Sequence, residues 1–335
     1  MSIKSFFIAG SIALLISSCA NDPLDVDASD VKVNIGFVNM DSIWSKSDGR
    51  DFLKANADFR ERIPEMYEYE LGYCLRVGRI SDTALINSLT QFKNDPFMSR
   101  VGKAIKREFK DLTSVKAELL DGFRHIKYHL PSAKLPSNIV FMNSVFTSSA
   151  FSSQKEIGIG LERYLGEKSP VIKDLPNDMF FGWIKEGMDR RYLVRDAFSS
   201  WIMTHYIQET DGNLAEQIIR WGKILYLTEA AIPDAPESII PRYSEEDYKW
   251  ALENEYSLWK YLVDQKMLFK IDELNKTNLL NEGPFTPGLP EKGPDRLGQF
   301  LGWRMVRKYM EVKDITVEEL MTIPYTEIIV EYEID

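Results

Sequence analysis

The chain has 335 residues, of which 44% are apolar and 12% aromatic, enough to bury a substantial core. This composition excludes an intrinsically disordered chain. The 51 acidic and 41 basic side chains give a net charge of −10, so a nucleic-acid partner is excluded as well. With three histidines and two cysteines, the sequence offers little material for a zinc cage, an iron–sulfur cluster or a disulfide scaffold, and we expect neither a metal nor another cofactor.

The first nineteen residues have the pattern of a bacterial lipoprotein signal. Lys4 is followed by an almost entirely apolar run at residues 6–16, and the letters ISSC then end at Cys19. An aliphatic residue, two small residues and a cysteine form a lipobox. The run is shorter than the roughly 20 residues that a membrane-spanning helix needs. The sequence therefore predicts a signal peptide at residues 1–18 and a lipid on Cys19; a disulfide with Cys74 is the alternative.

One globular domain is expected after this signal. Residues 19–31 are acidic and contain little to bury, which indicates a flexible tether. No second break in composition follows, so residues 32–335 are predicted to form a single domain. Its expected class is mainly α (α+β), a helical domain with a small β-sheet.

The first half of the domain mixes strands and helices. Alternating polar and apolar residues favour a strand at 32–40, and helical patterns follow. These helices are expected at 48–73, 81–92 and 98–128, the last with a break near Gly122. Two strands are then expected at 137–146 and 156–161, with a serine-rich turn at 147–153 between them.

The second half is predicted to be helical. Helices are expected at 192–209, 213–229, 245–265 and 294–310. Segments rich in proline and glycine separate them at 232–241 and 283–294.

Histidine spacing raises the possibility of a zinc site. His125 and His129 lie four residues apart, the spacing that places two imidazoles on one face of a helix. However, Ile126 stands where a zinc hydrolase needs a glutamate, and Pro131 indicates that the helix ends there. We expect both histidines to be solvated or to cap the helix. His205, four residues after Trp201, is expected to be hydrogen-bonded at the edge of the core.

Other catalytic motifs are absent from the sequence. The serines at 148–149 and 152–153 lack a G-x-S-x-G elbow, and the Gly158 and Gly160 pair lacks the rest of a dinucleotide fingerprint. A pair of catalytic carboxylates stays open, because such a pair is defined by its separation in space.

Two segments near the C-terminus are more informative. Residues 248–263 place aromatic and aliphatic side chains on one helical stripe, with Glu255 at its edge and therefore expected to be paired. In the helix at 294–310, Pro294 suits the first turn, and Gly298 and Gly302 expose the backbone beside Trp303. The buried stripe of this helix is expected to be Leu297, Leu301, Met305 and Tyr309. The glycine face is either packed in the core or a docking groove for a partner helix.

These segments resemble a known family, gliding-motility lipoprotein B (GldB). The resemblance rests on four features: the lipobox at Cys19, IGIGLERYLG at residues 157–166, the segment around Glu255, and PFT…GPDRLGQFLGWRMVRKYM at 284–310. It implies an envelope lipoprotein required for gliding, a motility associated with the type IX secretion machinery. It does not identify a reaction.

The family is also distantly similar to zinc-dependent peptidases with a His-Glu-x-x-His helix. That resemblance implies a degenerate zincin-like scaffold in which the metal helix corresponds to residues 192–206. Arg195 and Ser199 then occupy the ligand positions, Asp196 follows Arg195, and Glu255 is a remnant third ligand. Because a guanidinium cannot ligate zinc, the resemblance implies a cleft that has lost its metal.

Three functions remain open from the sequence. The first is a non-catalytic lipoprotein that contacts other proteins of the gliding or secretion apparatus. The second is an envelope zinc-dependent peptidase that uses His125, His129 or His205 with a carboxylate such as Glu255. The third is a lipoprotein that binds a peptide or glycan in the vestigial cleft. The favoured location is the outer membrane, on its periplasmic face.

Overall fold

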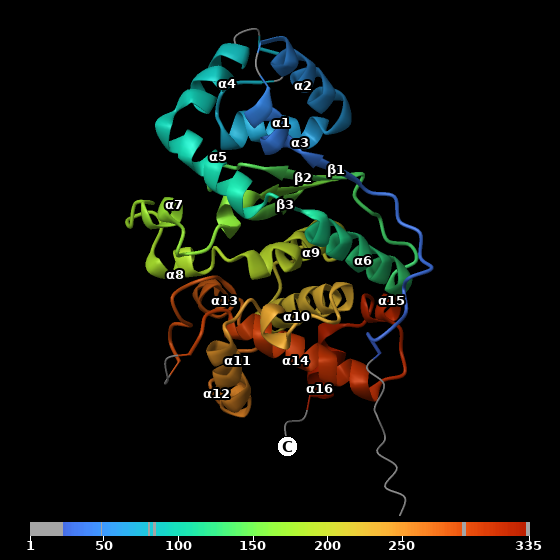
Figure 1. Cartoon of the computed structure of the whole chain (residues 1–335). Coiled ribbons are helices and arrows are strands. Elements are labelled where there is room, and N and C mark those ends of the chain that lie inside the picture. Colours follow the sequence, from blue (N-terminus) through green and yellow to red (C-terminus); the bar gives the residue numbers. More distant parts are fainter. Residues whose placement is uncertain (1–22, 48, 80, 83–84, 290–292, 333–335) are drawn as a thin grey trace, which may run out of the picture.

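A computed structural model of the chain describes residues 23–47, 49–79, 81–82, 85–289 and 293–332. The predicted signal peptide and the predicted lipidation site at Cys19 lie outside the described residues. Within them, helices predominate and a single small sheet is present, which confirms the mainly α class (Figure 1).

The sheet has four strands in the order β1-β2-β4-β3. Strands β1 (Gly36–Asn39), β2 (Asn138–Met142) and β4 (Glu156–Gly160) are parallel, and β3 (Ala150–Ser152) runs antiparallel to β4. The expected strands are confirmed, although each is shorter than predicted. The segment expected to be only a serine-rich turn contains β3.

Helices cover both faces of this sheet, so it separates two hydrophobic cores (Figure 1). Val38, Val140 and Met142 pack into the smaller core, whereas Ile139 and Ile157 belong to the larger one. Burial on both faces explains why the strand sequences are almost continuously apolar. The smaller core is closed by α1 (Met40–Lys46), α2 (Gly49–Arg62), α3 (Pro64–Tyr69), a π-helix (Glu70–Cys74) and α4 (Leu85–Asn94).

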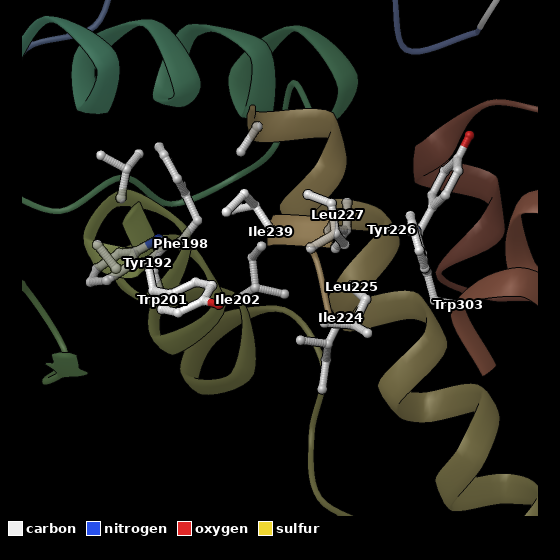
Figure 2. Packing of buried hydrophobic residues seen from close by; sticks show 14 of the residues in the cluster. Tyr192, Phe198, Trp201, Ile202, Ile224, Leu225, Tyr226, Leu227, Ile239 and Trp303 are labelled. Atoms are coloured by element: carbon white, nitrogen blue, oxygen red, sulfur yellow. The ribbon is translucent and has the colours of Figure 1, made fainter. Parts of the chain in front are cut away.

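The larger core contains the longest helices. α10 is buried on almost all sides, as expected for a central helix. Figure 2 shows Phe198, Trp201 and Ile202 on one side of it and Trp303 on the other. The helices of this core are α5 (Pro96–Glu108), α6 (Thr113–His129), α9 (Leu193–His205), α10 (Leu214–Ala231) and α14 (Leu297–Val312).

Shorter elements complete the chain. They are 3-10 turns at Leu161–Tyr164, Arg190–Tyr192 and Glu237–Ile239, and the helices α7 (Pro170–Lys173), α8 (Gly182–Glu186), α11 (Glu245–Glu253), α12 (Glu255–Asp264), α13 (Glu273–Leu280), α15 (Val317–Leu320) and α16 (Tyr325–Val330). No helix in the described residues is both long and apolar enough to cross a membrane.

The glycine face of α14 is filled by the protein itself. A Cβ atom on Gly302 would lie 1.9 Å from the carbonyl oxygen of Ile218, and one on Gly222 would lie 2.2 Å from the carbonyl oxygen of Gly302. The backbones of α10 and α14 therefore touch at this crossing. Gly298 makes a similar approach to Leu279 near the end of α13. The packing alternative is confirmed, and the predicted stripe of α14 is buried throughout.

Three predicted helices are divided differently than expected. The 48–73 segment divides at Ile63 into α2 and α3, and a π-helix follows α3. The break in the 98–128 segment lies at residues 109–112, whereas Gly122 is inside α6, where it makes room for the ring of Phe198. The 245–265 segment divides at Asn254 into α11 and α12. Leu252 in α11 and Tyr256 in α12 are exposed instead of lying on a buried stripe, whereas Leu258 and Leu262 are buried.

Two chain segments near element ends also differ from the prediction. α14 begins at Leu297, after Arg296 in the left-handed region at φ 52°, so Pro294 is not in its first turn. In the segment expected to be a solvated tether, Leu24 and Ala28 are buried, each with 2% exposure. Their apolar side chains extend the packed domain toward Cys19.

Candidate functional site

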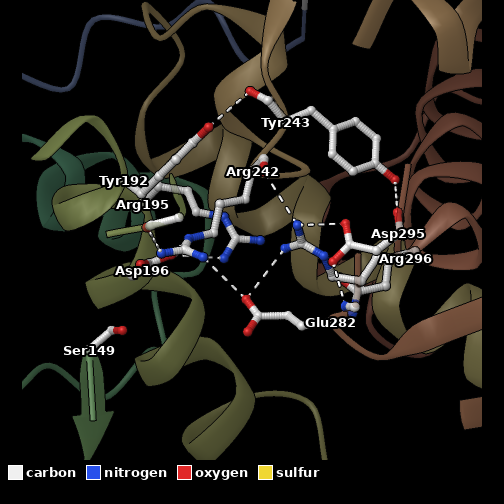
Figure 3. A network of polar contacts seen from close by, with 12 residues as sticks. Ser149, Tyr192, Arg195, Asp196, Arg242, Tyr243, Glu282, Asp295 and Arg296 are labelled. Atoms are coloured by element: carbon white, nitrogen blue, oxygen red, sulfur yellow. Dashed lines mark hydrogen bonds and ion pairs between the residues drawn. The ribbon is translucent and has the colours of Figure 1, made fainter. Parts of the chain in front are cut away.

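A polar cleft of about 470 Å³ lies between α8, the turn that precedes α11, and the loops that flank α13 and α14. Its floor carries charged side chains from four separate segments of the chain, namely Arg163, Arg242, Glu282, Asp295 and Arg296. Figure 3 shows that most of these groups point toward one another, with Glu282 between two arginines.

Arg242 is the centre of this network. Its Nη1 lies 3.2 Å from Oε1 of Glu282, its Nε lies 3.2 Å from Oδ1 of Asp196, and its Nη2 donates to the carbonyl of Gly187 at 2.7 Å. The guanidinium also lies over the ring of Tyr192, 4.8 Å from its centroid. These contacts hold the backbone at φ 65°, a left-handed conformation that is costly for a non-glycine residue.

Arg296 has a similar setting on the other side of Glu282. Its Nη2 lies 2.9 Å from Oδ1 of Asp295 and donates to the carbonyl of Arg242 at 3.3 Å, and its Nη1 lies 3.8 Å from Oε1 of Glu282. The second oxygen of Asp295 accepts the backbone N–H of Gly283 at 2.9 Å. Arg296 also has a left-handed backbone, so two residues in this conformation border one cleft.

The predicted pair Arg195 and Asp196 lies directly behind the cleft. Both come from the first turn of α9 and are at most 9% exposed. Arg195 Nη1 lies 3.2 Å from Oδ1 of Asp196, and its Nε donates to the carbonyl of Ile240 at 2.9 Å. Asp196 also accepts the hydroxyl of Tyr164 at 3.0 Å. Asp196 thereby connects Arg195 and Arg242.

Arg163 completes the group of arginines. It follows β4 in a 3-10 turn and is half-buried. Its Nε donates to Oγ of Ser149 at 3.2 Å and its Nη1 to the carbonyl of Phe146 at 3.4 Å. In the described part of the chain, no carboxylate lies within ion-pair distance of Arg163. We call Arg163, Arg195, Arg242 and Arg296 the arginine cluster.

Burial and charge pairing act in opposite directions on these groups. Burial opposes the charge of Arg242, but Asp196 and Glu282 outweigh it and raise the pKa of its guanidinium. For the half-exposed Glu282, partial burial favours the neutral acid, but Arg296 and Arg242 outweigh it and hold its pKa below the ordinary value. Burial lowers the pKa of Arg163. The cleft therefore contains charged arginines and an ionised Glu282 at neutral pH.

The other predicted site residues do not line this cleft. Oγ of Ser199 lies 2.9 Å from Oγ1 of Thr228, a buried contact between α9 and α10. Glu255 is paired, as predicted, but with Arg304 at 3.0 Å and with the hydroxyl of Tyr332. Trp303 donates to Glu229 at 2.7 Å inside the core. The structure thus brings Arg195 and Asp196 together and places Ser199 and Glu255 elsewhere.

The three histidines are also located away from the cleft. His125 is buried inside α6 at 8% exposure and contacts Asp121 one turn earlier, so the expectation of a solvated or capping histidine is wrong for it. His129 ends that helix, as expected from the proline that follows. Nε2 of His205 lies 2.9 Å from the carbonyl oxygen of Ser153 and its ring stacks on Trp201, which confirms a hydrogen-bonded histidine at the core edge. Within the described residues, no three His, Cys, Asp or Glu side chains are arranged to hold a metal ion.

The buried carboxyl group of Glu162, next to the arginine cluster, stabilises a turn of the backbone. Oε1 of Glu162 accepts the hydroxyl of Ser144 at 2.5 Å and the backbone N–H of Phe146 at 2.8 Å. Val145 and Phe146 are both in the left-handed region, so Glu162 fixes the strained turn that follows β2. Burial raises the pKa of Glu162. The same turn supplies the carbonyl that Arg163 contacts.

Most residues of the cleft have no sequence feature that identifies them. Arg242 and Glu282 lie in loops without a recognisable motif. Arg163 lies within IGIGLERYLG, however, and Asp295 and Arg296 lie within GPDRLG. Two segments that carry the family resemblance therefore contribute residues to the cleft. The adjacent charged residues in each segment are the sequence feature that points to them.

The fold and the cleft define a mainly helical protein with a small mixed sheet and a cleft lined by charged side chains. A family model described as "Gliding motility protein GldB" matches residues 21–333. Because this match covers nearly the whole sequence, the chain belongs to the GldB family, which relates it to gliding motility and indicates the cell envelope. Neither a curated protein nor a solved structure matches at a significant level. The relation to zinc-dependent peptidases stays a prediction.

Proposed function

We propose that this protein is a lipid-anchored component of the cell envelope that serves gliding by binding, without catalysing a reaction. Its lipid is attached to Cys19, and the outer membrane, on its periplasmic side, is its location. The binding site is the cleft that borders the arginine cluster. Its partners are other envelope proteins of the gliding or secretion apparatus.

The observation that carries this proposal is the chemistry of the cleft. Guanidinium groups stay protonated at physiological pH, so they bind anions and hydrogen-bond acceptors but do not act as bases. Two of them are held in costly left-handed conformations by several contacts each, as in a preorganised recognition site. A volume of about 470 Å³ is in the range of ligand sites.

Arg163→Gln tests this proposal in cells. Arg163 contacts only a hydroxyl and a carbonyl in the described structure, so its replacement leaves no buried carboxylate without its partner, and the fold is expected to persist. Cells that carry this variant as their only copy are expected to lose spreading on agar, while the amount of protein in membranes stays unchanged.

The matched control is Arg62→Gln. Arg62 lies at the end of α2 and is half-exposed, and among the described residues its side chain pairs only with Asp58 in its own helix. Cells with this variant should spread normally. Normal spreading of Arg163→Gln cells at normal protein levels would show that the cleft is not needed for gliding, and the proposal would be wrong.

A further inference from the structure

The arginine cluster carries more positive charge than its fixed partners neutralise. In the described residues, its four guanidinium groups are accompanied by two buried carboxylates, Asp196 and Asp295, and by Glu282. Asp196 and Asp295 are each held by an additional hydrogen-bond donor, from Tyr164 and Gly283. Within these ion pairs, one positive charge is left over with Glu282 in place and two without it, whereas the remaining lining of the cleft is mostly acidic. A carboxylate that enters the cleft can pair with the guanidinium of Arg163, which in the described residues donates only to a hydroxyl and a carbonyl.

Glu282 differs from the two buried carboxylates. Its side chain is 52% exposed and comes from the loop two residues after α13. Its contacts with Arg242 and Arg296 both use Oε1, and among the described residues no additional neutral donor holds it in the way that Tyr164 holds Asp196. Glu282 thus shows a position where a carboxylate lies between the guanidinium groups of two arginines. The loop that brings Glu282 there is exposed to solvent.

The rim of the cleft limits the charge of the groups that surround the carboxylate of a ligand. Acidic side chains line it at Glu167, Glu186, Asp189 and Asp247, together with the rings of Trp183 and Tyr192. Arg191 also lines it and pairs with Asp189 at 3.2 Å. An acidic rim repels a polyanion, whereas it favours a ligand that has one carboxylate and neutral or basic groups around it. Planar carboxylates also match the two-pronged geometry of guanidinium groups.

We infer that the cleft binds the carboxylate of a peptide whose neighbouring residues are neutral or basic, and that Glu282 occupies the carboxylate position when the ligand is absent. Arg242 and Arg296 hold the ligand carboxylate in place of Glu282, and Arg163 supplies the remaining positive charge. A chain terminus and an acidic side chain present the same group, and the experiment separates them. This inference rests on the proposed binding function and names the ligand class of the same cleft.

The test uses the full-length protein in detergent and three fluorescent peptides. The first is Lys-Ala-Ala with a free C-terminal carboxylate, the second is its C-terminal amide, and the third is Lys-Glu-Ala amide, with its only carboxylate on a side chain. Fluorescence anisotropy is expected to show about 10- to 100-fold tighter binding of the first peptide than of its amide, the range for a charge-assisted hydrogen-bonded pair. Comparable binding of the third peptide would assign the site to acidic side chains as well.

Two variants report on the roles assigned to the cleft residues. Glu282→Gln is expected to tighten binding of the carboxylate peptide several-fold, since the competing carboxylate is gone. Arg163→Gln is expected to weaken it about tenfold, and Arg62→Gln is the control that leaves it unchanged. Weaker binding by Glu282→Gln would overturn the role of Glu282 as an occupant.

Other results would overturn the ligand class itself. These are equal affinity for the first peptide and its amide, no binding of either at millimolar concentration, or tighter binding of inorganic phosphate than of the peptide. If Arg163→Gln abolishes gliding although no carboxylate peptide binds, the proposed function stands and the ligand class is wrong. If the peptides bind as expected but Arg163→Gln cells spread normally, the ligand class stands and the proposed function is wrong.

Discussion

Gly302→Ala should destabilise the protein because it forces two central helices apart. The new Cβ would lie 1.9 Å from the carbonyl oxygen of Ile218 and 3.1 Å from the backbone nitrogen of Gly222. Ordinary contact begins near 3.4 Å, so α10 and α14 must separate by 1.5 Å, the difference between 3.4 and 1.9 Å. Both neighbours are backbone atoms, so no flexible side chain can move aside.

The expected magnitude follows from two opposing contributions. Overpacking of a core costs about 1–3 kcal/mol, and the backbone contact places this crossing at the upper end. Replacing glycine by alanine inside a helix stabilises by about 1 kcal/mol. The expected net loss in free energy of unfolding is therefore about 2 kcal/mol.

Gly102→Ala is the matched control. Gly102 lies inside α5, and a Cβ built on it would have no atom within 4 Å. This variant is expected to gain about 1 kcal/mol from helix propensity alone. Urea unfolding followed by circular dichroism measures both free energies. Equal stabilisation by the two substitutions would refute the close approach of α10 and α14.

Two further predictions concern the anchor and the sheet. Cys19→Ala should abolish incorporation of radiolabelled palmitate and release the protein from the membrane fraction. The same change at buried Cys74 should leave palmitate incorporation and membrane retention unchanged. Membrane retention of the Cys19→Ala variant would show that the proposed lipid is not the anchor. Glu156, at the start of β4, is 1% exposed, and burial raises its pKa to about 7 although its Oε2 accepts the N–H of Met66 at 2.7 Å. Its neutral form is favoured by folding, so its contribution to stability is complete below the unfolded pKa near 4.5 and is lost as pH rises through about 7. Glu156→Gln should therefore stabilise the protein at pH 8 by about 1–3 kcal/mol and have little effect on stability at pH 4. Equal effects at the two pH values would show that the pKa of Glu156 is not raised by burial.

The helical stripes and strands were predictable because burial imposes a period on the sequence. The stripe of α14 at residues 297, 301, 305 and 309 is buried as expected, and apolar runs locate β2 and β4 within a few residues. Periodicity does not show where one helix ends and the next begins when both have a similar pattern. At Asn254 the chain turns without a proline or glycine, so the two halves read as one helix.

The cleft was less predictable because its residues are joined only in space. Arg163, Arg242, Glu282 and Arg296 come from four segments, and each is an ordinary surface residue when taken alone. Arg195 and Asp196 were singled out from a resemblance, and they do belong to the charged network. Glu255 was grouped with them, yet its partners are Arg304 and Tyr332. A charged residue of a buried network is recognised by the residues it contacts, and a single sequence does not show which residues are in contact.

The burial of Leu24 sets a limit on how far the protein reaches from its membrane. Leu24 is 2% exposed, and Cys19 precedes it by five residues. An extended chain covers at most about 3.6 Å per residue, so the packed body starts within about 18 Å of the lipid proposed on Cys19. In Figure 1, α8 and α13, which border the cleft, lie on the opposite side of the molecule from the N-terminal segment. A peptide that enters the cleft is therefore bound across the width of the packed body from the segment that leads to the proposed lipid, so the cleft faces partners beyond the layer next to the bilayer.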